Sequence, residues 1–123
     1  VMTATSNGST TRRLLILDNQ KLRRANAKVT TATAYKQGDL LTLSDANVAS
    51  HATDEKTWEV ICGQDITAVE ATAMAAAGIE MTIHFGGVFS VEGVSLAGVL
   101  LAPAKYDAAR AKATKNKIEL AKV

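Results

Sequence analysis

Cysteine, proline and aromatic residues are scarce in this chain. Its 123 residues include one cysteine, one proline and only 4% aromatics. A single cysteine, Cys62, excludes an internal disulfide framework and a multi-cysteine metal site. No apolar run approaches the roughly 20 residues that a membrane helix needs. The one early apolar run, residues 14–17, is shorter than a signal-peptide core. These absences argue against a membrane protein, a disulfide miniprotein and a zinc finger.

Small aliphatic residues supply most of the apolar content. Hydrophobic residues make up 47% of the chain and charged residues 21%, which is typical of a globular protein. The length is sufficient for one domain and too short for two full cores. Because large aromatic side chains are so few, we expect a small core built from valine, isoleucine and leucine.

Charge is divided unevenly along the chain. The net charge of +2 conceals +6 in residues 1–36, −8 in residues 37–104 and +4 in residues 105–123. Two interpretations fit this pattern. The segments neutralise one another within the fold or between subunits, or a basic arm meets an acidic partner, either nucleic acid or protein. We give more weight to the first when charge is considered alone.

The first 28 residues predict an N-terminal arm. Residues 1–10 are small and polar, so they bury too little apolar area to offset the entropy of ordering their backbone. We expect them to be flexible. Residues 11–28 contain the apolar run and several basic residues, without partners at helical spacing, and predict an arm that becomes ordered on binding. The ordered domain is expected to begin near Val29 and to occupy residues 29–123.

The rest of the chain predicts a domain of short strands. Two glycines, Gly86 and Gly87, interrupt the clearest alternating pattern and predict a bulge or a tight bend. Residues 48–56 are expected to form a loop, and residues 70–77 either a short helix ended by Gly78 or a loop of small residues. The expected strands cover residues 28–35, 40–43, 57–62, 79–91 and 117–123.

One helix is expected late in the chain. Pro103 suits a first helical position, and the pattern continues to Lys115, with Lys112 and Lys115 near the end where the helix dipole favours cations. The predicted fold class is therefore mostly β. It is a β-clip-like small domain of short strands with one late α-helix and a flexible N-terminal arm.

Residues that could support catalysis are few. The sequence contains no phosphate-binding glycine loop, nucleophile elbow or dinucleotide fingerprint. We expect His51 to be a solvated surface residue and His84 to make a cross-strand or subunit contact. Cys62 is expected to be a small buried hydrophobe, and a nucleophilic Cys62–His84 pair is the weaker alternative. The acidic residues lack metal-loop spacing. We therefore expect no enzymatic activity, no cofactor and no metal site.

The basic clusters of the arm are short. Arg12–Arg13 and Lys21–Arg24 lack the interleaved aromatics that single-strand binders use, and they match no groove-reading motif. Direct binding of nucleic acid is therefore not the favoured expectation.

Two stretches carry a resemblance to a known family. Residues Ala32–Leu43 (ATAYKQGDLLTL) open the body after a polar arm. Residues Ile79–Phe89 (IEMTIHFGGVF) precede a helix from Pro103 and a terminal strand Ile118–Leu120. This order resembles the head decoration proteins of tailed phages, of the lambda protein D type. The resemblance covers about residues 29–123, and it consists of patterns without an invariant signature.

The resemblance implies a structural function. Such proteins bind as trimers at three-fold sites on the outer surface of expanded capsids and stabilise them against internal DNA pressure. It implies a virion protein that is assembled in the host bacterial cytoplasm, with the major capsid protein as partner and no membrane partner. It also implies that the arm adds strands to a capsid-protein sheet, which is β-augmentation. The expected capsid-binding residues are Thr11, Arg12, Arg13, Leu14, Leu15, Ile16, Leu17, Arg23 and Arg24.

Two other functions stay open at this point. A small nucleic-acid-associated protein with the same basic arm would bind DNA with an affinity that falls steeply with salt. A subunit of another homomeric assembly, such as a tail or shell component, would form oligomers without affinity for capsids.

Overall fold

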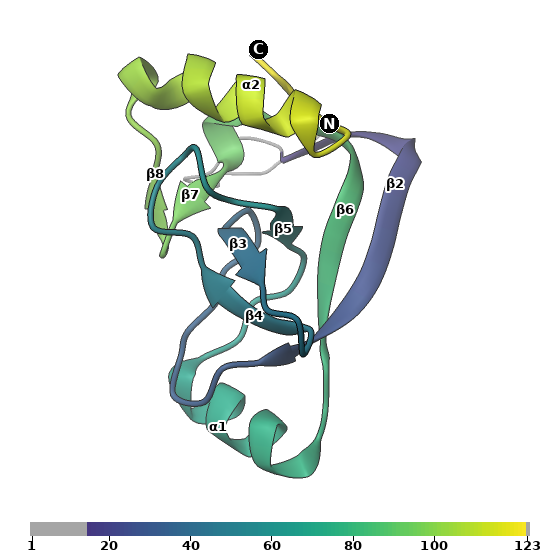
Figure 1. Cartoon of the computed structure of the whole chain (residues 1–123), viewed down its shortest axis with the longest axis vertical. Coiled ribbons are helices and arrows are strands. Elements are labelled where there is room, and N and C mark those ends of the chain that lie inside the picture. The colour runs from purple at the N-terminus through teal and green to yellow at the C-terminus, as the bar shows by residue number, and fades with distance from the viewer. Residues whose placement is uncertain (1–14, 123) are drawn as a thin grey trace, which may run out of the picture.

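The computed structural model describes the backbone of residues 15–122 and the side chains of all of these except 18–20. Strands predominate, as the sequence predicts, and a helix lies late in the chain (Figure 1). The elements in chain order are β2 (Ile16–Val29), β3 (Leu40–Leu43), β4 (Val48–His51), β5 (Val60–Cys62), α1 (Ala68–Ala77), β6 (Met81–Ser90), η1 (Val91–Gly93), β7 (Ser95–Leu96), β8 (Val99–Leu100), η2 (Pro103–Lys105), α2 (Tyr106–Lys115) and β9 (Ile118–Ala121).

Five strands of the main sheet form a closed ring of pairs. The end of β2 runs parallel to β4, and β4 pairs with β3, β3 with β5, and β5 with β6, all antiparallel. The ring closes because β6 also pairs with β2, again antiparallel. β9 extends the sheet by pairing in parallel with the second half of β6. Closure removes most free strand edges, so the few that are left in residues 15–122 are of interest.

The expected start of the ordered domain near Val29 is wrong. β2 begins at Ile16, and its register with β6 extends from Ile16 opposite Phe89 to Ala27 opposite Met81. Residues 16–28 therefore belong to the domain, because one side of β2 pairs with the chain's own β6 up to Ala27 and Lys28 pairs with β4. Residues 1–14, with the expectations made for them, lie outside the described residues.

The later elements mostly follow the sequence pattern, with two differences. The strand expected over residues 28–35 ends at Val29, and residues 48–56, expected as a loop, contain β4. Asn47, at a φ of 63°, closes the turn that lets β4 fold back on β3. Of the two alternatives for residues 70–77 the helix is right. It forms α1, with a capping box between Thr67 and Glu70 and with Gly78 as its left-handed C-cap.

The glycine pair of β6 lies opposite a bulge in β2. Between Asp18 and Arg23, β2 advances five residues while β6 advances two. A Cβ on Gly86 would lie 2.8 Å from Cγ of Arg23, and a Cβ on Gly87 would lie 3.4 Å from Cα of Leu22. Gly87 also has a φ of 133°, which strongly favours glycine. Of the two predicted alternatives there is no tight bend, since β6 continues through both glycines, and the bulge expected at the glycine pair lies instead in β2 opposite them. The glycines permit the bulged strand to approach β6 closely.

Both faces of the sheet are buried. One hydrophobic cluster includes Trp58 and Phe89 and is covered by two alanines of α2. The other includes Tyr35 and one alanine of α1. Neighbouring strand residues divide between the clusters, with Leu40 in the first and Leu41 in the second, because successive side chains point to opposite faces. We call the first the α2-side cluster and the second the α1-side cluster.

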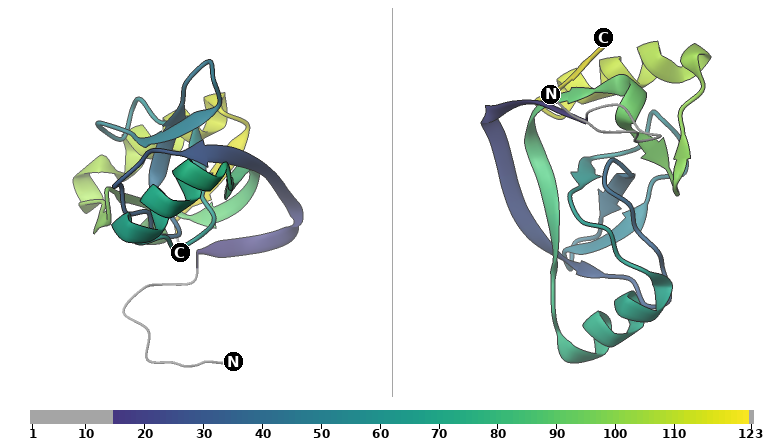
Figure 2. Two further views of the ribbon diagram at one scale, coloured as in Figure 1. Left: turned by 90° about the horizontal axis from the view of Figure 1, so that it is seen from below. Right: turned by 180° about the vertical axis from the view of Figure 1, so that it is seen from behind.

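The two helices lie at opposite ends of the long axis, α2 at the top of Figure 1 and α1 at the bottom. The views of Figure 2 agree. The short β7–β8 hairpin lies in the same half as α2. Neither helix of residues 15–122 has the length and hydropathy needed to span a membrane.

Candidate functional site

The apolar part of the predicted arm contacts the chain's own core. Leu15, Ile16 and Leu17 are half-buried, and the first two pack against the α2-side cluster. The carbonyl oxygen of Leu15 accepts a hydrogen bond from the backbone N–H of Ser90 at 2.7 Å. These residues therefore fix the beginning of β2 to the domain. The preceding candidates, residues 11–14, lie outside the described part of the chain.

The basic part of the predicted arm lies on the surface of β2. Arg23 and Arg24 are both exposed, and their Cα partners on β6 are Gly86 and His84. The structure thus separates the predicted site residues into an apolar group against the core and a basic group exposed to solvent. Sequence reasoning placed them all in one arm and did not anticipate that β6 would hold them.

β2 has an outer edge that faces away from β6. The N–H of Lys28 donates to the carbonyl of Asn47 at 2.8 Å, and the carbonyl of Asn26 accepts from the Asn47 side chain at 3.0 Å. Backbone groups alternate between the two sides of a strand, so those of Arg24 point to this outer side too. Over Ile16–Ala27 no strand of the described chain pairs with the outer side.

A groove of about 1070 Å³ runs beside the β2–β6 ribbon, lined also by α2 and β9. The side chain of Phe85 contributes to its wall and is 45% exposed. The guanidinium Nε of Arg110 donates to the carbonyl of Leu120 at 3.1 Å and so covers part of β9. Charges of both signs line the groove, which does not favour an anionic or a cationic ligand. They are Lys21, Arg23, Glu59, Asp107, Arg110, Lys117 and Glu119.

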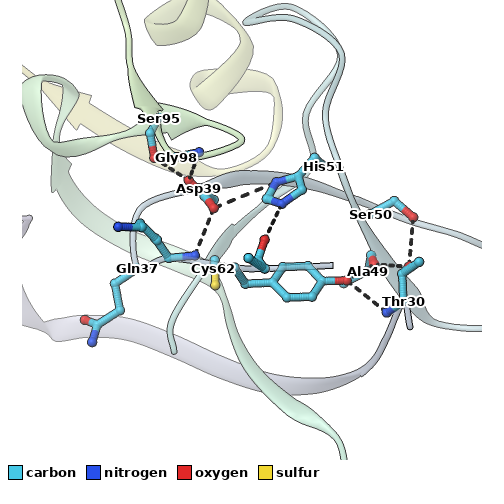
Figure 3. Close-up of polar contacts among 12 residues, drawn as sticks. Thr30, Gln37, Asp39, Ala49, Ser50, His51, Cys62, Ser95 and Gly98 are labelled. Atoms are coloured by element: carbon cyan, nitrogen blue, oxygen red, sulfur yellow. Dashed lines mark hydrogen bonds and ion pairs between the residues drawn. The ribbon is translucent and has the colours of Figure 1, made fainter. Parts of the chain in front are cut away.

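A buried carboxylate joins the β7–β8 hairpin to the sheet (Figure 3). Asp39 is buried and accepts hydrogen bonds from the Ser95 hydroxyl, from the Gly98 N–H at 2.9 Å and from the Lys36 N–H at 2.9 Å. Its Oδ2 also lies 3.8 Å from Nδ1 of His51. These contacts satisfy a carboxylate that would otherwise be costly to bury.

The residue types around Asp39 are those of a hydrolase triad, but their connections differ. In a triad the serine hydroxyl donates to the histidine, which activates it as a nucleophile. Here the Ser95 hydroxyl donates to Asp39 instead, and Ser95 is fully buried. The ring of His51 stacks on Tyr35 at 5.2 Å between centroids, and its Nε2 lies 2.7 Å from the Ala34 carbonyl oxygen. This arrangement holds the loops in position and does not activate the hydroxyl.

His51 is therefore not the solvated surface residue that was expected. It lies on β4 and is half-buried, and the contacts of its ring fix its orientation. The sequence predicted the turn at Lys36–Asp39, but it did not predict that the Asp39 carboxylate would lie beside His51. That contact depends on the pairing of β3 with β4.

Cys62 and His84 do not form a nucleophilic pair. Cys62 lies opposite Ile83 and His84 opposite Ile61, so the two side chains leave the sheet on opposite faces. Cys62 is buried in the α1-side cluster and its thiol donates to the Gln64 carbonyl at 3.0 Å. The interpretation of Cys62 as a small buried hydrophobe is confirmed.

His84 makes the cross-strand contact that was predicted. It lies on β6 between Ile61 of β5 and Arg24 of β2, and its ring packs against Phe89 at 5.4 Å between centroids. Burial lowers the pKa of His84 below its usual 6.5, and the nearby positive charge of Arg24 lowers it further. Neutral His84 thus belongs to the packed junction between β2, β5 and β6.

Within the described residues, no group of three or more histidine, cysteine, aspartate or glutamate side chains lies close enough together to hold a metal ion.

Comparisons with known proteins give no assignment. Neither a protein-family model nor a curated protein matches the chain. The resemblance to phage decoration proteins is therefore a hypothesis that depends on the residues quoted for it. Under this hypothesis, the candidate binding site is the outer edge of β2 together with the residues that precede β2.

Proposed function

We propose that this protein is a non-enzymatic capsid decoration protein. It binds the outer surface of an expanded phage head, as a trimer at three-fold sites, and stabilises the head against internal DNA pressure. The N-terminal segment attaches it by augmenting a sheet of the major capsid protein. No cofactor, metal ion or membrane takes part, and nucleic acid is not contacted directly.

The outer edge of β2 is the observation that carries this proposal. β2 is 14 residues long, and over Ile16–Ala27 only its inner side is paired within residues 15–122. An unpaired row of N–H and carbonyl groups is a template for another strand. A capsid strand added here would gain affinity from main-chain hydrogen bonds and register from alternate side chains.

The charge of this edge suits an acidic partner. Lys21, Arg23 and Arg24 lie on β2 with exposed side chains. Positive charge on an exposed strand discourages pairing between identical edges, because like charges repel. The same charge accelerates encounter with an acidic shell surface and helps to fix the register.

The apolar residues Leu15 and Ile16 have a different part in the proposal. Because they pack against the α2-side cluster, β2 is already extended before a partner strand arrives. A preordered strand loses less conformational entropy on binding than a free segment does. In a trimer, three such edges bind one shell together, and the combined attachment is far tighter than each alone.

The test separates the N-terminal segment from the edge. Deleting residues 1–14 keeps Leu15, Ile16 and the whole of β2, so the domain is expected to stay folded. Its binding to expanded heads that lack decoration protein should fall by the share that the N-terminal segment contributes, while the outer edge of β2 retains the rest. Arg24→Pro removes one outward N–H and leaves the inner side of β2 intact. We expect it to weaken shell binding about tenfold, which corresponds to about 1.4 kcal/mol. Co-sedimentation with the heads measures both variants.

Arg24→Gln is the matched control, because it removes the charge and keeps the N–H. It should bind shells more tightly than Arg24→Pro. Thermal unfolding of each variant excludes misfolding as the cause of a loss. Full shell occupancy by the protein without residues 1–14, together with wild-type binding of Arg24→Pro, would refute the augmentation mechanism. Tight DNA binding that requires Arg23 and Arg24 and disappears at moderate salt would support the nucleic-acid alternative instead.

A further inference from the structure

Asn47 covers the outer edge of β2 at one end. Its backbone carbonyl accepts a hydrogen bond from the N–H of Lys28 at 2.8 Å, and its side-chain amide donates to the carbonyl of Asn26 at 3.0 Å. β4 begins at the next residue, Val48, which pairs with Lys28. Asn47 thus occupies two outward backbone groups of β2 that an added strand would otherwise use.

The turn before β4 leaves the Asn47 side chain available for this contact. Asn47 has a φ of 63°, in the left-handed region that asparagine and glycine adopt more readily than other residues. Its N–H donates to the carbonyl of Ser44 at 2.9 Å, and the Ser44 N–H donates to the carbonyl of Val48 at 3.0 Å. Backbone hydrogen bonds therefore close the turn, and the side-chain amide of Asn47 bonds β2 instead.

Irregular register limits the outer edge in the other direction. The pairing of β2 with β6 shifts between Asp18 and Arg23 and again between Arg23 and Arg24, whereas it is regular from Arg24 to Ala27. Backbone groups alternate between the two sides of a strand only where the register is regular. The regular outer edge therefore offers the N–H and carbonyl of Arg24 and the N–H of Asn26. It fits an added strand of about five residues.

Charge on this short edge has one sign. Arg24 and Lys28 are exposed, and no acidic residue occurs in residues 19–38. The turn that contains Asn47, however, also carries the exposed Asp45. Opposite charges on directly opposed strand residues stabilise a pair, and like charges destabilise it. An acidic side chain is therefore favoured opposite Arg24 and disfavoured where the added strand approaches the turn.

We propose that the outer edge of β2 takes a short extended strand with an acidic residue opposite Arg24, and that Asn47 ends the pairing by occupying the carbonyl of Asn26. In the proposed function the added strand is part of the capsid protein, and this assignment rests on that function. A longer strand has to turn away from β2 where it reaches Asn47. Asn47 therefore helps to determine which strand fits.

A second copy of β2 is a poorer occupant of the same edge. Pairing two such edges places Arg24 and Lys28 of both copies along one interface, where like charges destabilise a strand pair. An acidic strand reverses the sign of that interaction. Charge thus selects the class of partner, while Asn47 and the register shifts limit its length.

A palindromic peptide tests the edge without a capsid. Acetyl-Thr-Val-Thr-Glu-Thr-Val-Thr-amide is rich in β-branched residues, which favour an extended strand. Because it reads the same in both directions, its glutamate can lie opposite Arg24 in a parallel or an antiparallel pair. Titration into the full chain should shift the amide NMR signals of Arg24 and Asn26. The matched peptide with a central lysine should bind at least about threefold more weakly.

Asn47→Gly tests the limit on pairing. Glycine keeps the left-handed turn and the carbonyl that accepts from Lys28, and it frees the carbonyl of Asn26. One more main-chain hydrogen bond should strengthen binding of the acidic peptide about fivefold. Ala46→Gly is the matched control, because it changes the same turn and keeps the Asn47 amide, and it should bind like the wild type. Thermal unfolding checks that both variants are folded.

The outcomes separate this assignment from the proposed function. A wild-type chain that does not bind the acidic peptide, or that binds both peptides equally, would overturn the proposed partner. Equal binding by the wild type and Asn47→Gly would overturn the part assigned to Asn47. Because these measurements contain no phage heads, head binding without peptide binding would refute only the acidic strand, and peptide binding without head binding would refute only the capsid proposal.

Discussion

α1 and α2 have the same length of ten residues and are fixed in opposite ways. α2 directs Ala109 and Ala113 into the α2-side cluster and places charged residues on its exposed positions. α1 buries only Ala71, and its other residues lie mostly in solvent. α2 is therefore stabilised mainly by packing on the domain, whereas α1 is stabilised mainly by the capping interactions at its two ends.

Local interactions explain how α1 persists. Thr67 and Glu70 form a reciprocal capping box, with the Thr67 N–H donating to the Glu70 carboxylate at 2.8 Å and the Glu70 N–H to the Thr67 hydroxyl at 3.1 Å. Gly78 closes the other end. Helices of this length are marginal in water without such caps or tertiary packing. A hydrogen bond from the Ala32 N–H to the Thr72 hydroxyl at 3.0 Å attaches this locally stabilised helix to the domain.

The largest expected difference between the two ends concerns packing. Phe89 is fully buried in the α2-side cluster, so Phe89→Ala should lower the free energy of unfolding by about 3–5 kcal/mol. Val69→Ala on the exposed side of α1 should change it by less than about 0.5 kcal/mol. Urea unfolding followed by circular dichroism measures both. Similar losses for the two variants would mean that Val69 is buried within the monomer.

Two glycines allow a comparison of intermediate size. Gly87 has a φ of 133°, and an added Cβ would lie 3.1 Å from Cε1 of Phe89, so Gly87→Ala should cost on the order of 3 kcal/mol. Gly78 has a φ of 71° and open space around it, so Gly78→Ala should cost on the order of 1 kcal/mol. Thermal unfolding of both variants tests the ranking. The reverse order would show that β2 does not cross β6 as closely as described.

The smallest expected effect is a dependence on pH at the junction of β2, β5 and β6. The pKa of His84 is lowered in the folded state by burial and by Arg24, so the unfolded chain binds the proton more readily. Stability is therefore present above the unfolded pKa of 6.5 and falls as the pH decreases from there toward the folded pKa. His84→Gln should reduce this dependence, as seen in urea midpoints measured from about pH 7.5 to pH 5. Parallel losses in variant and wild type would assign the effect to other groups.

Sequence patterns anticipated the local elements better than the faces they present. The alternation in residues 79–91 predicted the strand that forms β6, and Pro103 marked the beginning of the late helical region. Yet Phe85, on the apolar phase of that pattern, is largely exposed, and His84, on the polar phase, is buried. Phe85 lies at a register shift, because β6 advances two residues from His84 to Gly86 while β2 advances one from Arg24 to Arg23. His84 is buried because the sheet is covered on both faces by the α1-side and α2-side clusters.

The candidate site was only partly predictable for a related reason. From the sequence, Arg23 and Arg24 were expected as capsid-binding residues of the N-terminal arm, and the structure places both on β2 with exposed side chains. It did not indicate that Leu15 and Ile16 would pack on the core, because their partners lie more than 70 residues further along the chain at Phe89 and Ser90. The Asp39–His51 contact was missed in the same way, since it depends on the pairing of β3 with β4.

The sequence by itself determined the fold class, which is mostly β, and most of the local secondary structure. The alternation of β-branched residues, the turn residues, the glycine pair and the alanine-rich segments each act over a few residues. They therefore favour the same local structure whatever the rest of the chain packs against. Only the tertiary structure decided that β2 closes the sheet, that no strand within residues 15–122 pairs with its outer side over Ile16–Ala27, and that Val69 on α1 is exposed. Backbone hydrogen bonds between strands are the same for almost any side chains, so the choice of partner depends on which pairings bury both faces of the sheet together.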